Sequence, residues 1–232
     1  MTTATRRDQE RIGVLHSIQV GAPHHYGRED AQDEMARPWE TSFFRAPSSQ
    51  PRWLYTTHLE GNEQADKKNH GRPHQAVLLY AAAHYPLWQA ELDRPDFGPG
   101  GFAENFTVDG LTEATACIGD IYAIGEARIQ VTMPRYPCWK IERRWGIAGL
   151  TDRAAATGRT GWYCRVLREG EVQPGLPITL IERPYPQWTV ALTNDFGHNR
   201  NKDIETAQAL AACPLLPDLW RGLVVKRAMS AV

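Results

Sequence analysis

A strand pattern that runs into a proline-flanked cysteine spans residues 127–140, with the sequence ARIQVTMPRYPCWK. Apolar and polar residues alternate over residues 127–132, which predicts a half-buried β-strand. Pro134 and Pro137 then fix their own φ angles, and each removes a backbone hydrogen-bond donor, so a regular helix is disfavoured there. The sequence therefore predicts that Cys138 lies on a stiff, non-helical segment just after a strand.

Two interpretations of Cys138 follow from its neighbours. Arg135 and Lys140 place positive charge nearby, which favours the thiolate form and hence a reactive or metal-binding cysteine. Most free cysteines are instead small buried hydrophobic residues, and this stretch alone leaves that alternative open. The other cysteines, at positions 117, 164 and 213, form neither a C-x-x-C pair nor a zinc-type spacing.

Length and composition set the class of protein. The 232 residues suffice for one large domain, or one domain with a small appendage. A net charge of −1 gives no general attraction to nucleic acid or to a membrane surface. The polar first ten residues lack a secretory apolar region, and no apolar run is long enough to span a bilayer. With no cysteine pattern typical of secreted proteins, we expect a cytoplasmic location.

Short strand patterns separated by turn signals recur along most of the chain. The 19 glycines and 16 prolines favour many turns over a helix bundle. We expect short helices over residues 139–145 and 150–156, and a strand followed by a helix over residues 77–88. The pattern predicts a mainly β fold with helices (α+β), a closed or half-closed β-barrel. Further strands are predicted at 12–21, 53–59, 118–125, 161–167 and 176–182.

The composition changes at the proline-rich residues 183–186. Beyond them, helical patterns cover residues 188–194, 203–211 and 217–229, and Asp203 is placed to cap the second helix. We therefore expect a barrel domain over residues 1–185 and a three-helix extension over residues 186–232. Because few contacts cross a domain boundary, the extension is expected to be separable.

Several short motifs occur in a fixed order along the chain. They are Glu60–Asp66, Asn69–Gly71, Ala103–Asn105, Asp109–Leu111, Ile118–Asp120, Pro134–Lys140 and Gly158–Trp162. In these motifs the chain resembles the MOSC domain proteins, and among them the YiiM-like group. The resemblance covers residues 12–190, and the terminal helices resemble the three-helix extension of that group.

The resemblance implies a β-barrel of MOSC type that binds the molybdenum cofactor (Mo-molybdopterin). It makes Cys138 the expected metal ligand or sulfur-handling thiol, which suits a soft metal. It also implies reduction of N-hydroxylated bases or amines as small-molecule substrates. The sequence contains no flavin, haem or iron–sulfur motif, so electrons are expected from a separate reductase.

Other functions remain open. The chain can instead be a non-catalytic carrier of the cofactor or of sulfur on Cys138, or a barrel whose thiol is inert. The oligomeric state is also open, including a dimer. The cofactor content of the purified protein, followed by a reduction assay, separates these alternatives.

The other expected site residues follow from cofactor chemistry. A pterin phosphate needs cationic or N–H donors, for which we expect Lys68, Arg72 and Arg135, together with Gly71 of the same loop. Asn105 can bond a pterin edge, or it can simply close a turn after the glycine-rich residues 98–101. Tyr136 and Trp139 can stack on the pterin or pack against the barrel.

His70 is the expected catalytic proton donor to a reducible N–O bond, because its charge changes near neutral pH. The alternative is a histidine that only hydrogen-bonds to loop backbone. Gly71 and Pro73 disfavour a helical metal pair between His70 and His74.

The chain departs from the family pattern at four positions. Arg72 and His74 replace the second glycine and the aspartate of a His-Gly-Gly-Pro-Asp loop. Ala103 replaces the glycine of Gly-Glu-Asn, and Asn62 replaces an aspartate. Because Arg72 is bulky and His74 lacks a carboxylate, we expect the 70–74 loop to make different contacts in this chain.

Overall fold

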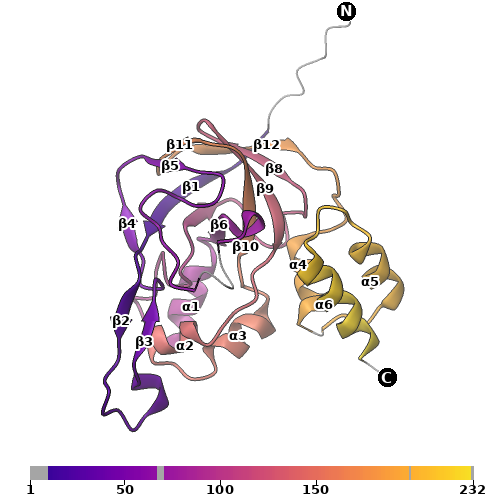
Figure 1. Ribbon diagram of the computed structural model, residues 1–232. Helices are drawn as coiled ribbons and strands as arrows, with labels where there is room; N and C mark the ends of the chain where they lie inside the picture. The colour runs from indigo at the N-terminus through magenta and orange to yellow at the C-terminus, as the bar shows by residue number, and fades with distance from the viewer. Residues whose placement is uncertain (1–9, 67–70, 199, 231–232) are drawn as a thin grey trace, which may run out of the picture.

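A closed β-barrel forms the centre of the protein (Figure 1). The structure, a computed structural model, describes residues 10–66, 71–198 and 200–230. Seven strands form the ring: β1 (Glu10–Val20), β6 (Val77–Ala81), β7 (Phe106–Asp109), β8 (Ile121–Ile124), β9 (Ala127–Pro134), β10 (Trp162–Arg168) and β12 (Pro177–Glu182). Their spatial order is β1, β7, β6, β10, β9, β8, β12, and β12 pairs with β1 to close the ring. The predicted barrel is therefore confirmed, in its closed form.

The barrel is mixed in strand direction. The β6–β7 pair is parallel, and the other six neighbouring pairs of the ring are antiparallel. The helix between β6 and β7, α1 (His84–Leu92), makes the crossover that a parallel pair requires. The predicted strand followed by a helix over residues 77–88 is thus confirmed.

Strand β9 is more deeply buried than its sequence pattern predicts. Ile129 and Val131 point into the core as expected, but the polar Gln130 and Thr132 on the opposite face are buried as well. Thr132 satisfies its hydroxyl by donating to the carbonyl oxygens of His74 (2.7 Å) and Tyr163 (3.0 Å). The half-buried prediction is wrong because other segments of the chain cover the outer face of this strand.

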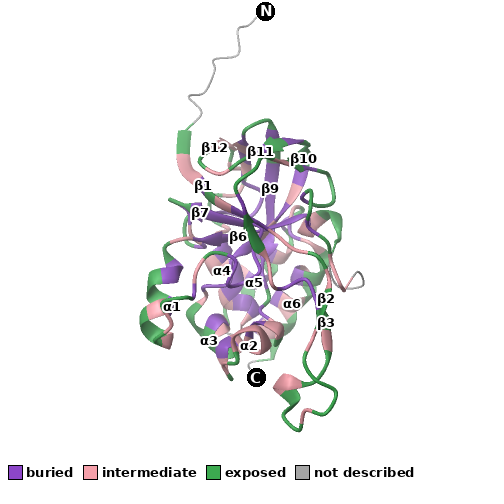
Figure 2. Ribbon diagram, turned by 90° about the vertical axis from the view of Figure 1, so that its left-hand side faces the viewer, coloured by how far each residue is buried: buried purple, intermediate pink, exposed green. Residues whose placement is uncertain are grey.

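Shorter strands extend from the ring. Strand β4 (Ala46–Ser48) pairs with β1, and β5 (Arg52–Leu54) pairs with β11 (Gly170–Val172). The hairpin of β2 (His24–Tyr26) and β3 (Trp39–Thr41) extends away from the barrel and is mostly exposed (Figure 2). A 3₁₀ turn, η1 (Glu34–Ala36), lies at its tip. The predicted strand over residues 53–59 is much shorter in the structure, because a turn begins after Leu54.

Three helices cover the end of the barrel at which β9 finishes: α1, α2 (Lys140–Trp145) and α3 (Leu150–Thr157) (Figure 1). They enclose a second apolar cluster that is rich in aromatic residues. Tyr80 stacks on Phe102 at a centroid distance of 4.5 Å, and its hydroxyl accepts a hydrogen bond from Trp88 Nε1. A short 3₁₀ turn, η2 (Pro73–Gln75), precedes β6.

The C-terminal helices are α4 (Val190–Gly197), α5 (Ile204–Ala211) and α6 (Asp218–Met229), drawn in gold in Figure 1. Asp203 caps α5, as predicted, by accepting hydrogen bonds from Glu205 N and Thr206 N. None of the helices in the described ranges is long and apolar enough to cross a membrane.

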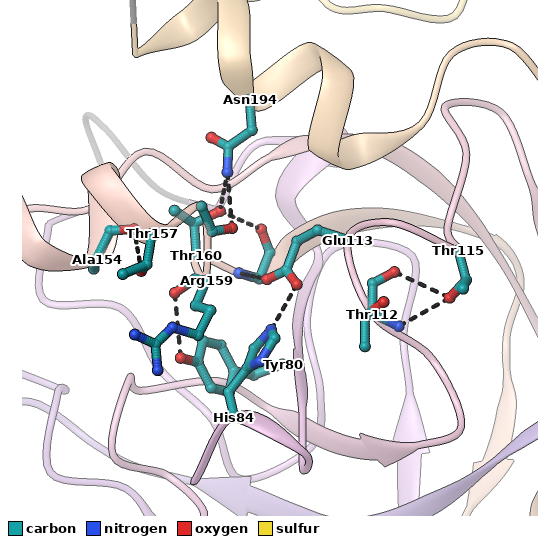
Figure 3. Close-up of polar contacts among 12 residues, drawn as sticks. Tyr80, His84, Thr112, Glu113, Thr115, Ala154, Thr157, Arg159, Thr160 and Asn194 are labelled. Carbon is teal, nitrogen blue, oxygen red and sulfur yellow. Dashed lines mark hydrogen bonds and ion pairs between the residues drawn. The ribbon is translucent and has the colours of Figure 1, made fainter. Parts of the chain in front are cut away.

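These helices share the core of the barrel. Val190, Phe196 and Trp220 belong to the same apolar cluster as the residues inside the ring. Asn194, fully buried on α4, donates hydrogen bonds to Gly158 O (3.0 Å) and Thr160 Oγ1 (2.9 Å), as Figure 3 shows. Barrel and extension therefore share one apolar cluster and are joined by these hydrogen bonds, and the separability of the extension stays a prediction.

Candidate functional site

A pocket opens at the end of the barrel where β9 finishes and β10 begins. Its empty volume is about 700 Å³, including the part open to solvent, which is within the usual range for small-molecule sites. Segments far apart in the sequence line it, at residues 41–45, 64–66, 75–78, 103–105, 135–140 and 163. No single motif forms the site, because its residues come together only in the folded barrel.

Cys138 lies in this pocket, two residues before the first turn of α2. Its backbone oxygen accepts hydrogen bonds from Ile141 N and Thr151 Oγ1, both at 3.1 Å, which anchors the segment to α2 and α3. The residue is half-buried, whereas Cys117, Cys164 and Cys213 are buried. The structure thus presents one thiol to a pocket, on the non-helical segment that the two prolines predict.

Arg45 supplies a buried, unsatisfied cation to the same pocket. The residue as a whole is half-buried, but its Nε and Nη1 atoms are inaccessible to solvent and have no hydrogen-bond partner among the described residues. Burial lowers the pKa of Arg45 to about 10, which still leaves the guanidinium charged at neutral pH. Because unpaired buried donors are rare in native proteins, this group indicates a missing anionic partner.

Two further arginines surround Arg45. Arg135, 4% exposed, donates from Nη1 to Phe102 O at 2.6 Å, and Arg144 donates from Nη1 to Phe43 O at 2.6 Å. The charges of Arg135 and Arg144 contribute to the lowered pKa of Arg45, after burial. Burial lowers the pKa of Arg144 as well. Like charges gathered out of water are costly, so the cluster favours an anion.

Glu104 provides part of the compensating negative charge. Its carboxylate is fully buried and accepts hydrogen bonds from Gly100 N (2.6 Å), Thr107 Oγ1 (2.7 Å) and the hydroxyl of Tyr85. Its charge raises the pKa of both Arg45 and Arg144. Asp66, which lines the pocket, is a second carboxylate, so two carboxylates face four cationic side chains: Arg45, Arg135, Arg144 and Lys140. Cationic groups therefore outnumber anionic ones around the pocket.

The residue before Glu104 has an unusual backbone conformation. Ala103 lines the pocket with a φ of +54°, in the left-handed region that favours glycine. This is the position where the related motif has glycine. Alanine therefore adopts here a conformation that favours glycine, at the cost of local strain.

Asn105 also lines the pocket, but its amide is used by the backbone. Its Oδ1 accepts from Leu78 N at 3.2 Å, and its Nδ2 donates to Gln19 O at 3.4 Å. The side chain thus ties β6 and β1 together, which favours the structural alternative. Gln75, nearby on η2, has a buried Oε1 with no partner among the described residues. Its amide oxygen can therefore accept a hydrogen bond from a ligand, whereas the amide of Asn105 is already bonded to the backbone.

The structure brings together only some of the expected residues. Cys138, Arg135 and Asn105 line the pocket. Gly71 is exposed, and Arg72 lies in a different groove, so neither lines the Cys138 pocket. Lys68 and His70 lie outside the described residues, and their predicted roles stay predictions.

Two aromatic residues flank Cys138 at the surface. Tyr136, 49% exposed, lines the pocket and stacks on His198 of the extension, with ring centroids 4.8 Å apart. Trp139, 50% exposed, packs against Trp39 of the β2–β3 hairpin and beneath Arg143. Tyr136 is therefore at the pocket, whereas Trp139 packs on the hairpin and does not line the pocket.

Sequence reasoning missed Arg45 and Gln75. Arg45 ends a short stretch with no motif, and Gln75 follows a loop whose histidines draw attention first. Lys140, noted only as a charge near the cysteine, also lines the pocket. The signal that identifies the first two is an unpartnered buried polar atom, which exists only once the chain is folded.

Two family models and several known proteins match this chain. A MOSC domain model matches residues 66–179, and a model of the YiiM-like 3-alpha helix domain matches residues 188–231. The chain is 36% identical to the uncharacterized protein YflK of Bacillus subtilis, across 94% of this chain and 96% of that protein. It is 34% identical to a protein named "Reductase" from Gibberella moniliformis, across 82% of this chain but 34% of that protein.

A solved structure agrees with these sequence matches. The crystal structure of YiiM from Geobacillus stearothermophilus superimposes with a TM-score of 0.76 at 30% identity. The match covers 93% of this chain and 99% of that one, so barrel and helical extension are both shared. On the combined evidence of barrel, extension, motif order and relatives, the chain belongs to the YiiM-like proteins of the MOSC domain family.

Proposed function

We propose that the Cys138 pocket binds the molybdenum cofactor, and that the protein uses it to reduce N-hydroxylated bases or amines. The proposal rests most on one observation. The thiol of Cys138 lines the same pocket as Arg45, whose buried Nε and Nη1 have no hydrogen-bond partner among the described residues. A soft sulfur ligand and an unsatisfied cation match the two ends of a metal-bearing, phosphorylated pterin.

The residues present fit this cofactor. Cys138 Sγ would hold the metal, and Arg45, Arg135 and Lys140 would hold the phosphate, since all four line the pocket. The buried Oε1 of Gln75, which has no partner in the part of the chain that the structure describes, would accept a hydrogen bond from an N–H of the pterin. Phe43, Leu78 and Ala103 form an apolar wall that excludes water from the reacting atoms. When bound, the cofactor supplies a two-electron redox centre.

The overall reaction fixes what else is needed. Reduction of R–NHOH to R–NH₂ breaks the N–O bond, forms an N–H bond, releases water, and consumes two electrons and two protons. A separate reductase would supply the electrons. The fungal relative named "Reductase" supports this division of labour, because about two thirds of its length lies outside the match. A reduced Cys138 would be maintained in the cytoplasm, where we place this activity.

A carrier role is the second candidate. The same thiol and cations would hold the cofactor, or sulfur, for transfer to another protein, and Tyr136 and Lys140 would then contact the acceptor at the pocket mouth. Both functions require the cofactor to bind, but only the enzyme converts substrate repeatedly. An assay of the cofactor-loaded protein separates them.

The experiment uses full-length protein from a cofactor-producing host, with a chemical reductant and an N-hydroxylated purine. We expect repeated turnovers per bound molybdenum, and loss of turnover in protein from a host that cannot make the cofactor. Bound molybdenum without turnover, but with transfer to a cofactor-free acceptor enzyme, would favour the carrier. Equal turnover with and without molybdenum would contradict both.

A further inference from the structure

A second groove lies on the seam between the barrel and the C-terminal helices. Its barrel side consists of residues 72–74 and Arg165 of β10, and its other side is the 214–221 segment that leads into α6. Its empty volume is about 850 Å³, including the part open to solvent, and it shares no lining residue with the Cys138 pocket. The groove is therefore a separate site.

Positive charge dominates this groove. Arg72, Arg165 and Arg221 line it, against the single carboxylate of Asp218. Asp218 is almost fully exposed and pairs with Arg221 Nη1 at 3.3 Å, at the rim. Arg165 donates from Nη2 to Leu215 O at 3.3 Å, which holds its guanidinium across the seam. The interior is therefore left with more cationic than anionic groups.

Two buried polar atoms in the groove lack partners. Arg165 Nε and His74 Nε2 are inaccessible to solvent and have no hydrogen-bond partner among the residues that the structure describes. Burial, and then the charges of Arg72 and Arg165, lower the pKa of His74, so its ring is neutral at pH 7. Buried polar atoms normally have partners, and two of them in one cationic groove indicate a ligand.

The groove contains residues at which this chain departs from the family pattern. Arg72 and His74 are the two residues by which the 70–74 loop departs from the His-Gly-Gly-Pro-Asp pattern, and both line the groove. Glycine and aspartate at these positions would remove one cation and add one carboxylate. Both departures thus make the groove more positive.

We propose that this groove binds the phosphate group of a phosphorylated small molecule. Arg165 and His74 donate from the barrel side, and the 214–221 segment forms the other side of the groove. The organic part lies against Leu215, Leu219 and Pro214, which form the apolar side. A ligand held in this way contacts both barrel and extension.

Calorimetric titration of the full chain with phenyl phosphate, and with inorganic phosphate, tests the proposal. We expect phenyl phosphate to bind more tightly than inorganic phosphate. We expect Arg165→Gln, and separately the double variant Arg72→Gly with His74→Asp, to weaken it by about tenfold or more, the scale of a lost charge-assisted contact. The double variant changes a surface loop, so it remains informative if Arg165→Gln folds poorly.

Two control variants test whether the phosphate binds in this groove. Arg168→Gln removes an exposed charge from the same strand and should leave affinity unchanged. Arg45→Gln alters the Cys138 pocket and should also leave it unchanged. The proposal is overturned if wild type does not bind, if Arg168→Gln weakens binding equally, or if Arg45→Gln alone abolishes it. It is also overturned if phenyl phosphate binds no more tightly than inorganic phosphate.

Discussion

The ring of Tyr136 stacks on the imidazole of His198, which joins the segment carrying Cys138 to the end of α4. His198 Nε2 is buried and has no hydrogen-bond partner in the described part of the chain. Burial, followed by the charges of Arg200 and Arg227, lowers the pKa of His198 to about 4. The folded protein therefore keeps this histidine neutral at pH values where an unfolded chain would protonate it.

This shift predicts a pH dependence of stability. The unfolded imidazole titrates near pH 6.5, so between about pH 6.5 and 4 the unfolded chain binds a proton that the native chain does not. The free energy of unfolding should fall as pH drops through that window, and His198→Gln should flatten the fall. Urea unfolding at several pH values measures it. His25→Gln, at a highly exposed position, should keep the wild-type slope; an unchanged slope in His198→Gln would count against the assignment.

Asn194→Ala should destabilise the whole protein. The substitution removes donors to Gly158 O and Thr160 Oγ1 at a fully buried position between extension and barrel. We expect a loss of about 1–3 kcal/mol, with a single unfolding transition retained because the core is shared. Gln208→Ala, exposed on α5, is the control and should change stability little. Separate melting of the helices from the barrel would contradict this picture.

Ala103→Gly should preserve or raise stability. Glycine removes the strain of a positive φ, which offsets its greater chain entropy and the loss of one buried methyl group. We expect a gain between zero and about 1 kcal/mol, whereas Ala154→Gly, in the buried part of α3, should cost about 1 kcal/mol. Thermal unfolding of both variants checks the contrast. A comparable loss in both would mean that residue 103 is not strained.

Cys138 should be the first of the four cysteines to be alkylated. It is half-buried in an open pocket, whereas the other three are buried. Burial, together with the charge of Asp120, also raises the pKa of Cys117 and Cys164, which disfavours their reactive thiolates. Mass spectrometry after short exposure to iodoacetamide gives the order of labelling. Earlier labelling of any of the other three would show that the pocket thiol is shielded.

Much of the fold could be predicted from local patterns. Strand periodicity, turn residues and the cap at Asp203 identify most elements within a few residues. The burial of both faces of β9 could not be predicted, because it depends on segments that pack against the strand from elsewhere in the chain. The packing between barrel and extension could not be predicted for a related reason: Val190 and Phe196 belong to the same apolar cluster as the barrel residues, and this contact joins segments that are far apart in the sequence.

The site was only partly predictable, because several of its residues come together from segments far apart in the sequence. Cys138 and Arg135 belong to one motif, so sequence alone identified them together. Arg45 and Gln75 reach the pocket from separate segments. They are recognised by buried atoms that have no partner within residues 10–66, 71–198 and 200–230, and no local pattern reveals this. Arg72 was assigned to a cofactor phosphate from its charge, but the path of the loop takes it to the second groove.

The proposed function requires Cys138 and Arg45 to hold the molybdenum cofactor in one pocket. The most direct measurement is the molybdenum and pterin content of wild type, Cys138→Ser and Arg45→Gln, purified from a cofactor-producing host, with the melting temperature of each. Serine keeps the size of the side chain but is a poor ligand for a soft metal. We predict molybdenum near one per chain in wild type, loss of molybdenum in Cys138→Ser, loss of molybdenum and pterin together in Arg45→Gln, and cooperative melting throughout. Full molybdenum content in a folded Cys138→Ser protein would contradict the role of Cys138 as the metal ligand.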